Sequence, residues 1–584
     1  MPEKSVTVFS FADGHDASAA LIRDGKVLAA LQEERLTNIK HYDGTPERSM
    51  RAVFEIANVE PSEVNVIAIA NLVRVCAPTS SKVRVPSALP KESSINKRIW
   101  LSLHMLGYVP FIDSHTYAKL YVRILHKFRE MRQINKVLEN LGLTDKETVF
   151  VDHHMAHASA AYRSSPWSYN DKVLVVTADG AGDGLSSTVN IGREGRISRV
   201  ASSTSFNSLG NTLYGAITVH LGLKPWEDEY KTMGLAPYGQ PERCIRQIRR
   251  IIRISPKNSL EFENTISPFL PAKLQTLLYH QRFDHIAAAV QKYLEELLVA
   301  WIGTAIHQFD VHKIACAGGI FLNVKANKRI REMPEVEDLF VYPAAGDDGT
   351  SIGAGLQAYF EYCRREGIKP AKGSFTDVYY GPYYEDDQVE AVLKETGWIK
   401  KAQHYEAINL HVADMLAHGK IIARFNGRSE WGPRALGNRS ILADARELKI
   451  VNRINSAIKH RDFWMPFAPT ILEDQMSEYL VNSKPAPYMI LAFDTTEKRD
   501  EIVASIHPWD KTCRPQTLTE AWNPGYFELV EAFREKTGVG GLLNTSFNLH
   551  GYPMVCDPKQ ALWTLENSEL DGLALGNYYI TRKA

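Results

Sequence analysis

A pattern of strand, acidic glycine-containing turn and strand occurs twice in this 584-residue chain, about 165 residues apart. Short apolar runs bounded by aspartate and glycine are typical of β-strands joined by tight turns. The predicted strands are Val6–Ala12, Ala17–Ile22 and Val27–Gln32 in the first copy, and Lys172–Thr177 and Ser186–Ile191 in the second. The repetition predicts an α/β domain built by internal duplication.

Paired acidic turns of this kind occur in the superfold shared by actin, sugar kinases and Hsp70, where they face a nucleotide from opposite sides. Glycines allow backbone N–H groups to approach phosphate, and a carboxylate can hold the water molecules of a cation. An ordinary tight hairpin explains either turn alone, but the pair favours the superfold. We therefore predict that Asp179, Gly180 and Gly182 bind ATP together with Mg²⁺.

Two later strand-to-helix turns fit the same architecture. The predicted strand Lys313–Ala317 leads through Gly318 and Gly319 into a helical stretch. Glycines at such a turn allow a nucleotide to approach closely, so both are predicted to contact it. A further turn contains Asp347 and Asp348, and either can supply a carboxylate to a metal ion, with a solvated turn as the alternative.

His153 and His157 stand four residues apart, where a β-rich run ends and an alanine-rich helix is predicted to begin. This spacing places both imidazoles on one helix face, where they can share a metal ion, although such a pair can also simply cap and pack. Position 154 is His rather than Glu, which argues against a zincin protease. Two histidines and one carboxylate with open positions suit iron(II), and zinc also fits. We predict His153, His157 and Asp347 as the ligands.

Composition limits the class of protein. Lys+Arg and Asp+Glu are both 68, and this zero net charge is not a signature of nucleic-acid binding. The six cysteines include no Cys-x-x-Cys, so neither a disulfide framework nor a thiolate zinc site is indicated. The first residues lack a basic and apolar leader, and no stretch approaches about 18 uninterrupted apolar residues. We expect a soluble, cytoplasmic protein that does not span a membrane.

A polar stretch at 364–373, broken by glycine and proline, is predicted to link two domains with limits of 1–370 and 378–584. The first domain is expected to carry a helical insert near 78–148. Within it, Lys82–Lys136 holds eleven Lys and Arg against three Asp and Glu. A basic lid over an anionic acceptor and a solvated helical insert are both compatible with this charge.

The second domain is rich in arginine. Five arginines lie between Arg424 and Arg446, interleaved with glycine, proline and tryptophan. Arginine forks bind phosphate through paired charge-assisted hydrogen bonds, and an exposed charged loop is the alternative. The cations predicted to bind phosphate here are Arg424, Arg434, Lys459, Arg461 and Arg514.

Several segments together carry a resemblance to a known family. They are Gly14–Ala20, the histidine cluster at 153–157, Met233–Gly239, Gly318–Asn323, Gly432–Gly437 and Leu543–Asn548. Their order and number extend over nearly the whole chain. On these motifs, the chain resembles the NodU/CmcH-type O-carbamoyltransferases.

The resemblance implies an actin-like N-terminal domain related to the tRNA threonylcarbamoyl transferase, and a C-terminal α/β domain similar to the YrdC-like carbamoyl-adenylate synthase. It implies an enzyme that uses ATP and carbamoyl phosphate to form carbamoyl-adenylate. The carbamoyl group would then pass to a hydroxyl of a small natural product, as in antibiotic or toxin biosynthesis. Iron(II) is the metal that it implies, and a homodimer is compatible with it.

The resemblance also implies roles for individual residues. These are Arg434, Lys459 and Arg514 for carbamoyl phosphate and ATP, Lys231 and Asn323 for the nucleotide, and His15 and Lys40 for the transferred carbamoyl group and the acceptor. For Lys40, a solvated surface position is the alternative.

An RNA-acting threonylcarbamoyl transferase with both activities fused is the alternative function. The balanced net charge weakens it, because RNA binding normally leaves a basic footprint, whereas the basic segment Lys82–Lys136 keeps it open. We expect a small hydroxylated acceptor and no nucleic acid.

Overall fold

The computed structural model describes residues 5–75, 116, 119–122, 131–265, 270–373, 375, 377–459 and 461–582. They form two compact units, the first from Met1–Leu28 and Tyr42–Phe375 and the second from Ala29–His41 and Thr376–Ala584.

The predicted linker at 364–373 lies at the end of the first unit. The segment Ala29–His41 belongs to the second unit, although the expected limits of 1–370 and 378–584 assigned it to the first domain. Most of the basic segment Lys82–Lys136 lies outside the described residues.

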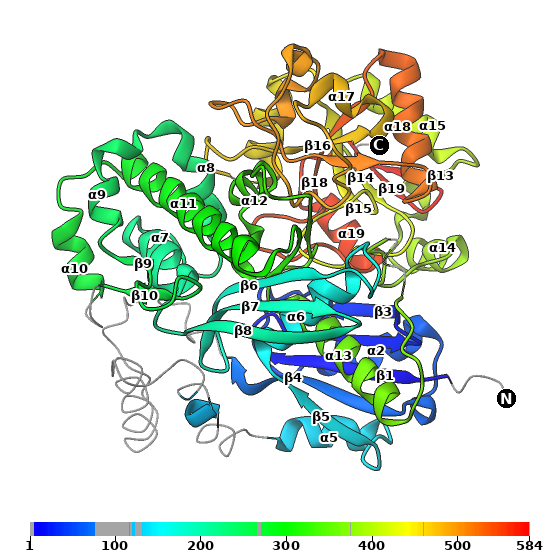
Figure 1. Ribbon diagram of the computed structural model, residues 1–584. Coiled ribbons are helices and arrows are strands. Elements are labelled where there is room, and N and C mark those ends of the chain that lie inside the picture. Colours follow the sequence, from blue (N-terminus) through cyan, green and yellow to red (C-terminus); the bar gives the residue numbers. More distant parts are fainter. Residues whose placement is uncertain are drawn as a thin grey trace. The chain divides into compact units, whose positions relative to one another are not determined.

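The first unit contains two five-stranded sheets (Figure 1). The strands of the first, in spatial order, are β3 (Lys26–Gln32), β2 (Ser18–Arg23), β1 (Thr7–Gly14), β4 (Val66–Val75) and β5 (Glu147–Val151). Strand β1 pairs antiparallel with β2 and parallel with β4, which pairs parallel with β5. The three strands predicted in the first repeat are therefore present.

The second sheet repeats this arrangement. Its strands, in spatial order, are β8 (Arg196–Thr204), β7 (Leu185–Arg193), β6 (Val173–Gly182), β11 (Lys313–Ala317) and β12 (Asp338–Val341). Strand β6 pairs antiparallel with β7 and parallel with β11, which pairs parallel with β12. Because strand order and pairing directions match in the two sheets, the predicted duplication is confirmed. The first unit has the duplicated α/β fold of actin, sugar kinases and Hsp70.

Two helices, α6 (His153–Ser164) and α13 (Thr350–Arg365), lie between the sheets (Figure 1). Helix α6 packs on β6 and β11, α13 packs on β1 and β4, and the two helices contact each other. Their approach is close at Gly353, where an added Cβ would lie 1.9 Å from the Ala156 carbonyl oxygen. Small residues at this crossing therefore fix the depth at which the start of each helix sits between the sheets.

Several of the remaining described helices of the first unit form a lobe around the long helix α11. The remaining described helices are α2 (Glu47–Ala57), α5 (Arg132–Asn140), α7 (Ala216–His220), α8 (Glu229–Leu235), α9 (Ile245–Ile248), α10 (Leu270–Leu277), α11 (Phe283–Phe309) and α12 (Val324–Arg331), with a two-stranded sheet of β9 (Ile252–Ile254) and β10 (Phe262–Asn264). Helix α11 buries apolar side chains such as Leu294, Trp301 and Ile302, which make it the core of this lobe.

The second unit is built on one eight-stranded mixed sheet. Its strands, in spatial order, are β13 (Ala402–His404), β20 (Tyr578–Thr581), β19 (Gly572–Leu575), β14 (Ile422–Phe425), β15 (Arg439–Asp444), β18 (Gly541–Ser546), β16 (Ala468–Leu472) and β17 (Gln516–Leu518). Its described helices are α1 (Glu33–Thr37), α14 (Asp386–Glu395), α15 (Ile408–Ala417), α16 (Lys449–Ile454), α17 (Met476–Tyr479), α18 (Pro524–Thr537) and α19 (Pro558–Glu566). Helices α15 and α18 cover the core, which contains Leu416, Leu442 and Phe533.

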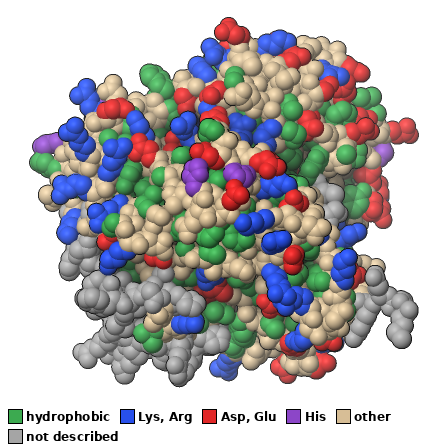
Figure 2. All heavy atoms as spheres, in the orientation of Figure 1, with side chains coloured by type: hydrophobic (Ala, Val, Ile, Leu, Met, Phe, Trp, Pro, Cys, Tyr) green, Lys and Arg blue, Asp and Glu red, His purple; other side chains and the backbone are tan. Residues whose placement is uncertain are grey.

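Charge is mixed over the surface. On the face drawn in Figure 2, basic and acidic side chains are interspersed, in keeping with their equal numbers in the sequence. None of the described helices has the length and apolar character needed to cross a membrane.

Candidate metal centre and cationic cluster

The histidine pair predicted from the sequence lies at the start of α6. The Asp152 carboxylate caps this helix by accepting the Met155 N–H at 2.8 Å. His153 and His157 are both buried, and their ring centroids are 4.6 Å apart with the rings nearly perpendicular, at 82°. The helix therefore presents two imidazoles to the same point.

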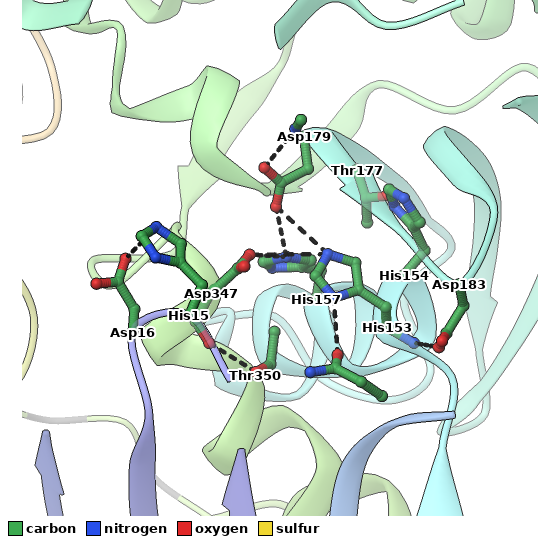
Figure 3. Close-up of polar contacts among 12 residues, drawn as sticks. His15, Asp16, His153, His154, His157, Thr177, Asp179, Asp183, Asp347 and Thr350 are labelled. Atoms are coloured by element: carbon green, nitrogen blue, oxygen red, sulfur yellow. Dashed lines mark hydrogen bonds and ion pairs between the residues drawn. The ribbon is translucent and has the colours of Figure 1, made fainter. Parts of the chain in front are cut away.

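Two carboxylates converge on these imidazoles (Figure 3). Asp347 Oδ1 lies 3.7 and 3.6 Å from the Nε2 atoms of His153 and His157, and Asp179 Oδ2 lies 3.5 and 2.9 Å from the same two atoms. We call these four residues the histidine–carboxylate cluster; one ligand atom from each lies within 4.8 Å of the others. The three residues predicted as metal ligands are thus brought together, with Asp179 as a fourth.

The donor set fits a divalent metal ion. Both Nε2 atoms and Asp179 Oδ2 are buried and make no hydrogen bond of normal geometry, as expected of atoms arranged around a shared ligand. His153 Nδ1 lies 2.7 Å from Asn71 Oδ1, which leaves the Nε2 lone pair directed at the cluster. Two histidines and two carboxylates suit iron(II) or zinc.

The electrostatics of the cluster also favour a cation. Burial opposes ionisation of Asp179, but the neighbouring His153 and His157 hold its pKa well below the usual range. Burial, and next the negative charge of Asp179, raise the pKa of Asp347 well above its usual range. Two carboxylates that share a dry site cannot both ionise easily, so a divalent cation would stabilise both in the charged form.

A second group of charged residues lies in the second unit, at the end of β18. Lys459 is buried, and its Nζ donates to the carbonyl oxygens of Ser546 and Asn548 at 2.6 and 3.0 Å and to Asn548 Oδ1 at 2.6 Å. Burial, then the charges of Arg461 and Lys40, lower the pKa of Lys459 well below its usual range. A buried ammonium is thus held beside other cations.

Arg514 also lies beside other cations. Burial, then the charges of Arg434 and Arg461, lower the pKa of its guanidinium well below the usual range. We call Arg434, Lys459, Arg461 and Arg514 the cationic cluster. Within the described residues, the charges that act most strongly on Lys459 and Arg514 are other cations. Such a group of cations favours an anionic ligand, and phosphate fits arginine forks.

Two family models match the chain: Carbamoyltransferase N-terminus over residues 9–356, and Carbamoyltransferase C-terminus over residues 413–582. The first match alone covers more than half of the chain. The chain belongs to the carbamoyltransferase family. The family predicted from the sequence motifs is therefore confirmed.

Relatives of this carbamoyltransferase are similar over nearly its whole length. Nodulation protein NolNO of Sinorhizobium fredii is 30% identical over 97% of this chain and 79% of its own. An uncharacterized protein of Methanocaldococcus jannaschii is 31% identical over 97% of this chain and 98% of its own. Among solved structures, full-length HypF in the phosphate- and nucleotide-bound form is 11% identical, with a TM-score of 0.35 over 61% of this chain and 47% of HypF.

The glycines of this carbamoyltransferase that were predicted to admit a nucleotide also have packing roles. An added Cβ on Gly182 would lie 2.1 Å from the His153 ring, and one on Gly180 would lie 2.9 Å from Asn211 Oδ1. Gly318 has a φ of 104°, and its Cβ would lie 2.2 Å from the Ala178 carbonyl oxygen. A Cβ on Gly319 would lie 3.1 Å from Asp179 Oδ1. These glycines keep the backbone close to the cluster.

Several other aspartates and predicted ligands of the carbamoyltransferase are held by protein groups. The Asp183 carboxylate accepts backbone N–H groups of Leu72, Val73 and His153 at 2.9, 2.7 and 2.8 Å and so anchors the start of α6.

Asp348, the alternative to Asp347, is not a member of the cluster. Asn323 caps α12 and pairs with Gln291, and Lys231 Nζ lies 3.3 Å from Asp228. Arg424 donates to the Gly437 carbonyl and Asn438 Oδ1 at 2.9 and 3.0 Å.

His15 and Lys40, which the resemblance placed together, belong to different units. His15 lies in the turn between β1 and β2, its Nε2 3.3 Å from Asp16 Oδ2, and its charge acts on Asp347 (Figure 3). Lys40 belongs to the second unit, where its charge acts on Lys459. His15 thus interacts electrostatically with the histidine–carboxylate cluster of its unit, and Lys40 with the cationic cluster of its own.

Proposed function

We propose that this chain is an ATP-dependent O-carbamoyltransferase that forms carbamoyl-adenylate from carbamoyl phosphate and transfers the carbamoyl group to a hydroxyl of a small molecule. The observation that carries the proposal is that the described residues of each unit include a cluster of functional side chains, and that the two clusters have opposite chemistry. The cationic cluster suits phosphate-bearing substrates, and the histidine–carboxylate cluster suits a divalent metal ion. Family membership identifies carbamoyl as the group transferred.

The first half-reaction is assigned to the second unit. Carbamoyl phosphate reacts with water to give phosphate and carbamate, whose oxygen attacks the α-phosphorus of ATP and displaces pyrophosphate. Both reactants are anions, so their approach requires fixed positive charge. Lys459 and Arg514 supply it from positions where burial and like charges already disfavour the free cationic form. A bound anion relieves that penalty, which favours the loaded site.

The second half-reaction is assigned to the first unit. The acceptor hydroxyl oxygen bonds to the carbamoyl carbon through a tetrahedral oxyanion, and AMP leaves. His153, His157, Asp179 and Asp347 would hold a divalent metal, expected to be iron(II), whose Lewis acidity stabilises such an oxyanion. His15, which pairs with Asp16 beside the cluster, accepts the proton of the hydroxyl group.

The test follows the two half-reactions separately in the full-length, metal-loaded protein. Pyrophosphate release that depends on carbamoyl phosphate measures the first, and mass spectrometry of a panel of hydroxylated small molecules detects acceptors that gain one carbamoyl group. Both signals are expected. A folded, metal-loaded protein that releases no pyrophosphate contradicts the first step, and threonylcarbamoylated RNA as the product contradicts the small-molecule acceptor.

A further inference from the structure

Trp226 has an unusual backbone conformation close to the histidine–carboxylate cluster. It lies between α7 and α8 with a φ of 64°, in the left-handed region that a bulky residue rarely adopts. Glu229 Oε1 stabilises this conformation by accepting the Trp226 N–H at 2.7 Å. Strained backbone of this kind persists only where the surroundings hold it, and it is concentrated at functional sites.

The indole ring is held on two sides. Its N–H donates to Asn211 Oδ1 at 2.9 Å, and the ring packs on the imidazole of His15, with centroids 5.3 Å apart and the rings inclined at 52°. Trp226 is half-buried, and the side chain of His15 is only 12% exposed. The ring therefore fixes one side of the imidazole that faces Asp347.

A chain of hydrogen bonds connects this ring to the cluster. Asn211 lies in the π-helical segment Leu209–Gly215, and its backbone N–H donates to Ser208 Oγ at 2.9 Å. Ser208 Oγ in turn lies 3.0 and 2.7 Å from the carbonyl oxygens of Asp179 and Gly180. Short π-helical segments are rare and frequently mark functional sites. The indole is thus tied through two residues to the backbone of a cluster carboxylate.

We propose that Trp226 is a positioning residue of the transfer site, which holds the His15 imidazole in place relative to Asp179 and Asp347. The inference rests on the proposed function, because it takes His15 as the acceptor of the hydroxyl proton. A glycine at position 226 would remove the backbone strain. The strain is explained if the position of the aromatic ring matters for the reaction.

The first test is Trp226→Gly, with Trp226→Asn as a second variant, because both residues tolerate positive φ. Each should stay folded, since relief of strain offsets part of the lost ring packing and of the lost hydrogen bond to Asn211, and should bind as much metal as wild type and release pyrophosphate within about twofold of the wild-type rate. The kcat of carbamoyl transfer should fall about 10- to 100-fold, because a small misplacement of a reacting group has an effect of this size, while KM for the acceptor stays within about threefold. Trp226→Phe, which keeps a ring against His15, should restore much of kcat.

Asp310→Gly is the matched control. It relieves a φ of 49° at the end of α11, at an exposed residue, and should leave kcat unchanged. Wild-type kcat in both ring-free variants of Trp226 would overturn the inference, as would a loss of kcat that merely follows a loss of stability.

The second test is a double-mutant cycle with His15→Gln. If Trp226 acts through His15, Trp226→Gly should cause no further loss of kcat in the His15→Gln background. Losses that multiply in the double variant would overturn the positioning role. Wild-type transfer by His15→Gln alone would contradict the proposed role of His15, and the inference with it. If His15→Gln lowers the kcat of transfer but Trp226→Gly does not, only the positioning role of Trp226 is contradicted.

Discussion

The two clusters differ in the side chains that form them: histidines and carboxylates in the first unit, and lysine and arginines in the second. In the first unit, two imidazoles converge with two carboxylates, and the carboxyl group of Asp347 has a raised pKa. In the second, Lys459 is held by carbonyl oxygens, and it and Arg514 have lowered pKa values. These opposite pKa shifts accompany the opposite ligands that we propose, a cation for the first unit and an anion for the second.

The largest effect is expected from His157→Ala. Removing one of two imidazoles should abolish stable metal binding and reduce carbamoyl transfer by about a thousand-fold or more, because Lewis-acid stabilisation is worth several kcal/mol. Pyrophosphate release should continue, since the cationic cluster is untouched. Elemental analysis and the two half-reaction assays measure this. His154→Gln is the control, because the His154 ring packs against that of His153 but supplies no ligand atom to the cluster, and its Nδ1 lies 2.8 Å from Thr177 Oγ1. Equal metal content in His157→Ala and wild type would refute the metal site.

Arg514→Ala should act on the other half-reaction. Loss of a charge-assisted contact of roughly 1.5–3 kcal/mol lowers kcat/KM for pyrophosphate release about ten- to over a hundred-fold. Because neighbouring cations oppose the charge of Arg514, the melting temperature should stay the same or rise. Transfer from supplied carbamoyl-adenylate should persist. Arg446→Ala, whose guanidinium pairs with Asp444 at 2.6 Å, is the control. A parallel loss of both half-reactions in folded Arg514→Ala would contradict the separation of the clusters.

Substitution of Asn71, the hydrogen-bond partner of His153 Nδ1, should have a smaller effect. Asn71→Gly removes the partner of His153 Nδ1 while suiting the Asn71 φ of 71°. Loss of such a supporting contact typically weakens metal affinity 10- to 100-fold. Asn71→Asp keeps an acceptor and should bind metal at least as tightly as wild type. Competition with a chelator gives the affinities, and identical values for Asn71→Gly and wild type would argue against this role.

The two clusters should respond to pH in opposite directions. The raised pKa of Asp347 means that a proton competes with the metal, so metal affinity should rise with pH, by about tenfold per unit for each proton displaced. The lowered pKa of Lys459 means that its charge is lost as pH rises, so pyrophosphate should bind more weakly. Calorimetric titrations of each ligand between pH 6 and 9 measure both slopes. Slopes of the same sign would contradict the opposite charges of the two proposed ligands.

The sequence was most informative where chemistry is local. The repeat predicted β1, β2 and β3 in the first half and β6 and β7 in the second, and the i, i+4 histidines predicted one face of the cluster. The place of Asp179 was not predictable, because its distance from the histidines depends on how β6 and α6 pack across the unit. Gly182 was interpreted as a phosphate contact, whereas its lack of a Cβ also makes room for the His153 ring. That Lys40 belongs to the second unit was not predictable, because this depends on packing between segments far apart in the chain.

The segment Ala29–His41 has a consequence for folding during synthesis. The guanidinium of Arg35 donates to the carbonyl oxygen of Gly432, 397 residues later in the chain. At about 5–20 residues per second, roughly 20–80 s separate the emergence of the two partners from the ribosome. Strand β3 of the first sheet therefore continues into a segment whose contacts with the second unit cannot form until that unit has been synthesised. A C-terminal fragment starting after the linker also lacks this segment, so adding residues 29–41 as a peptide should raise its stability.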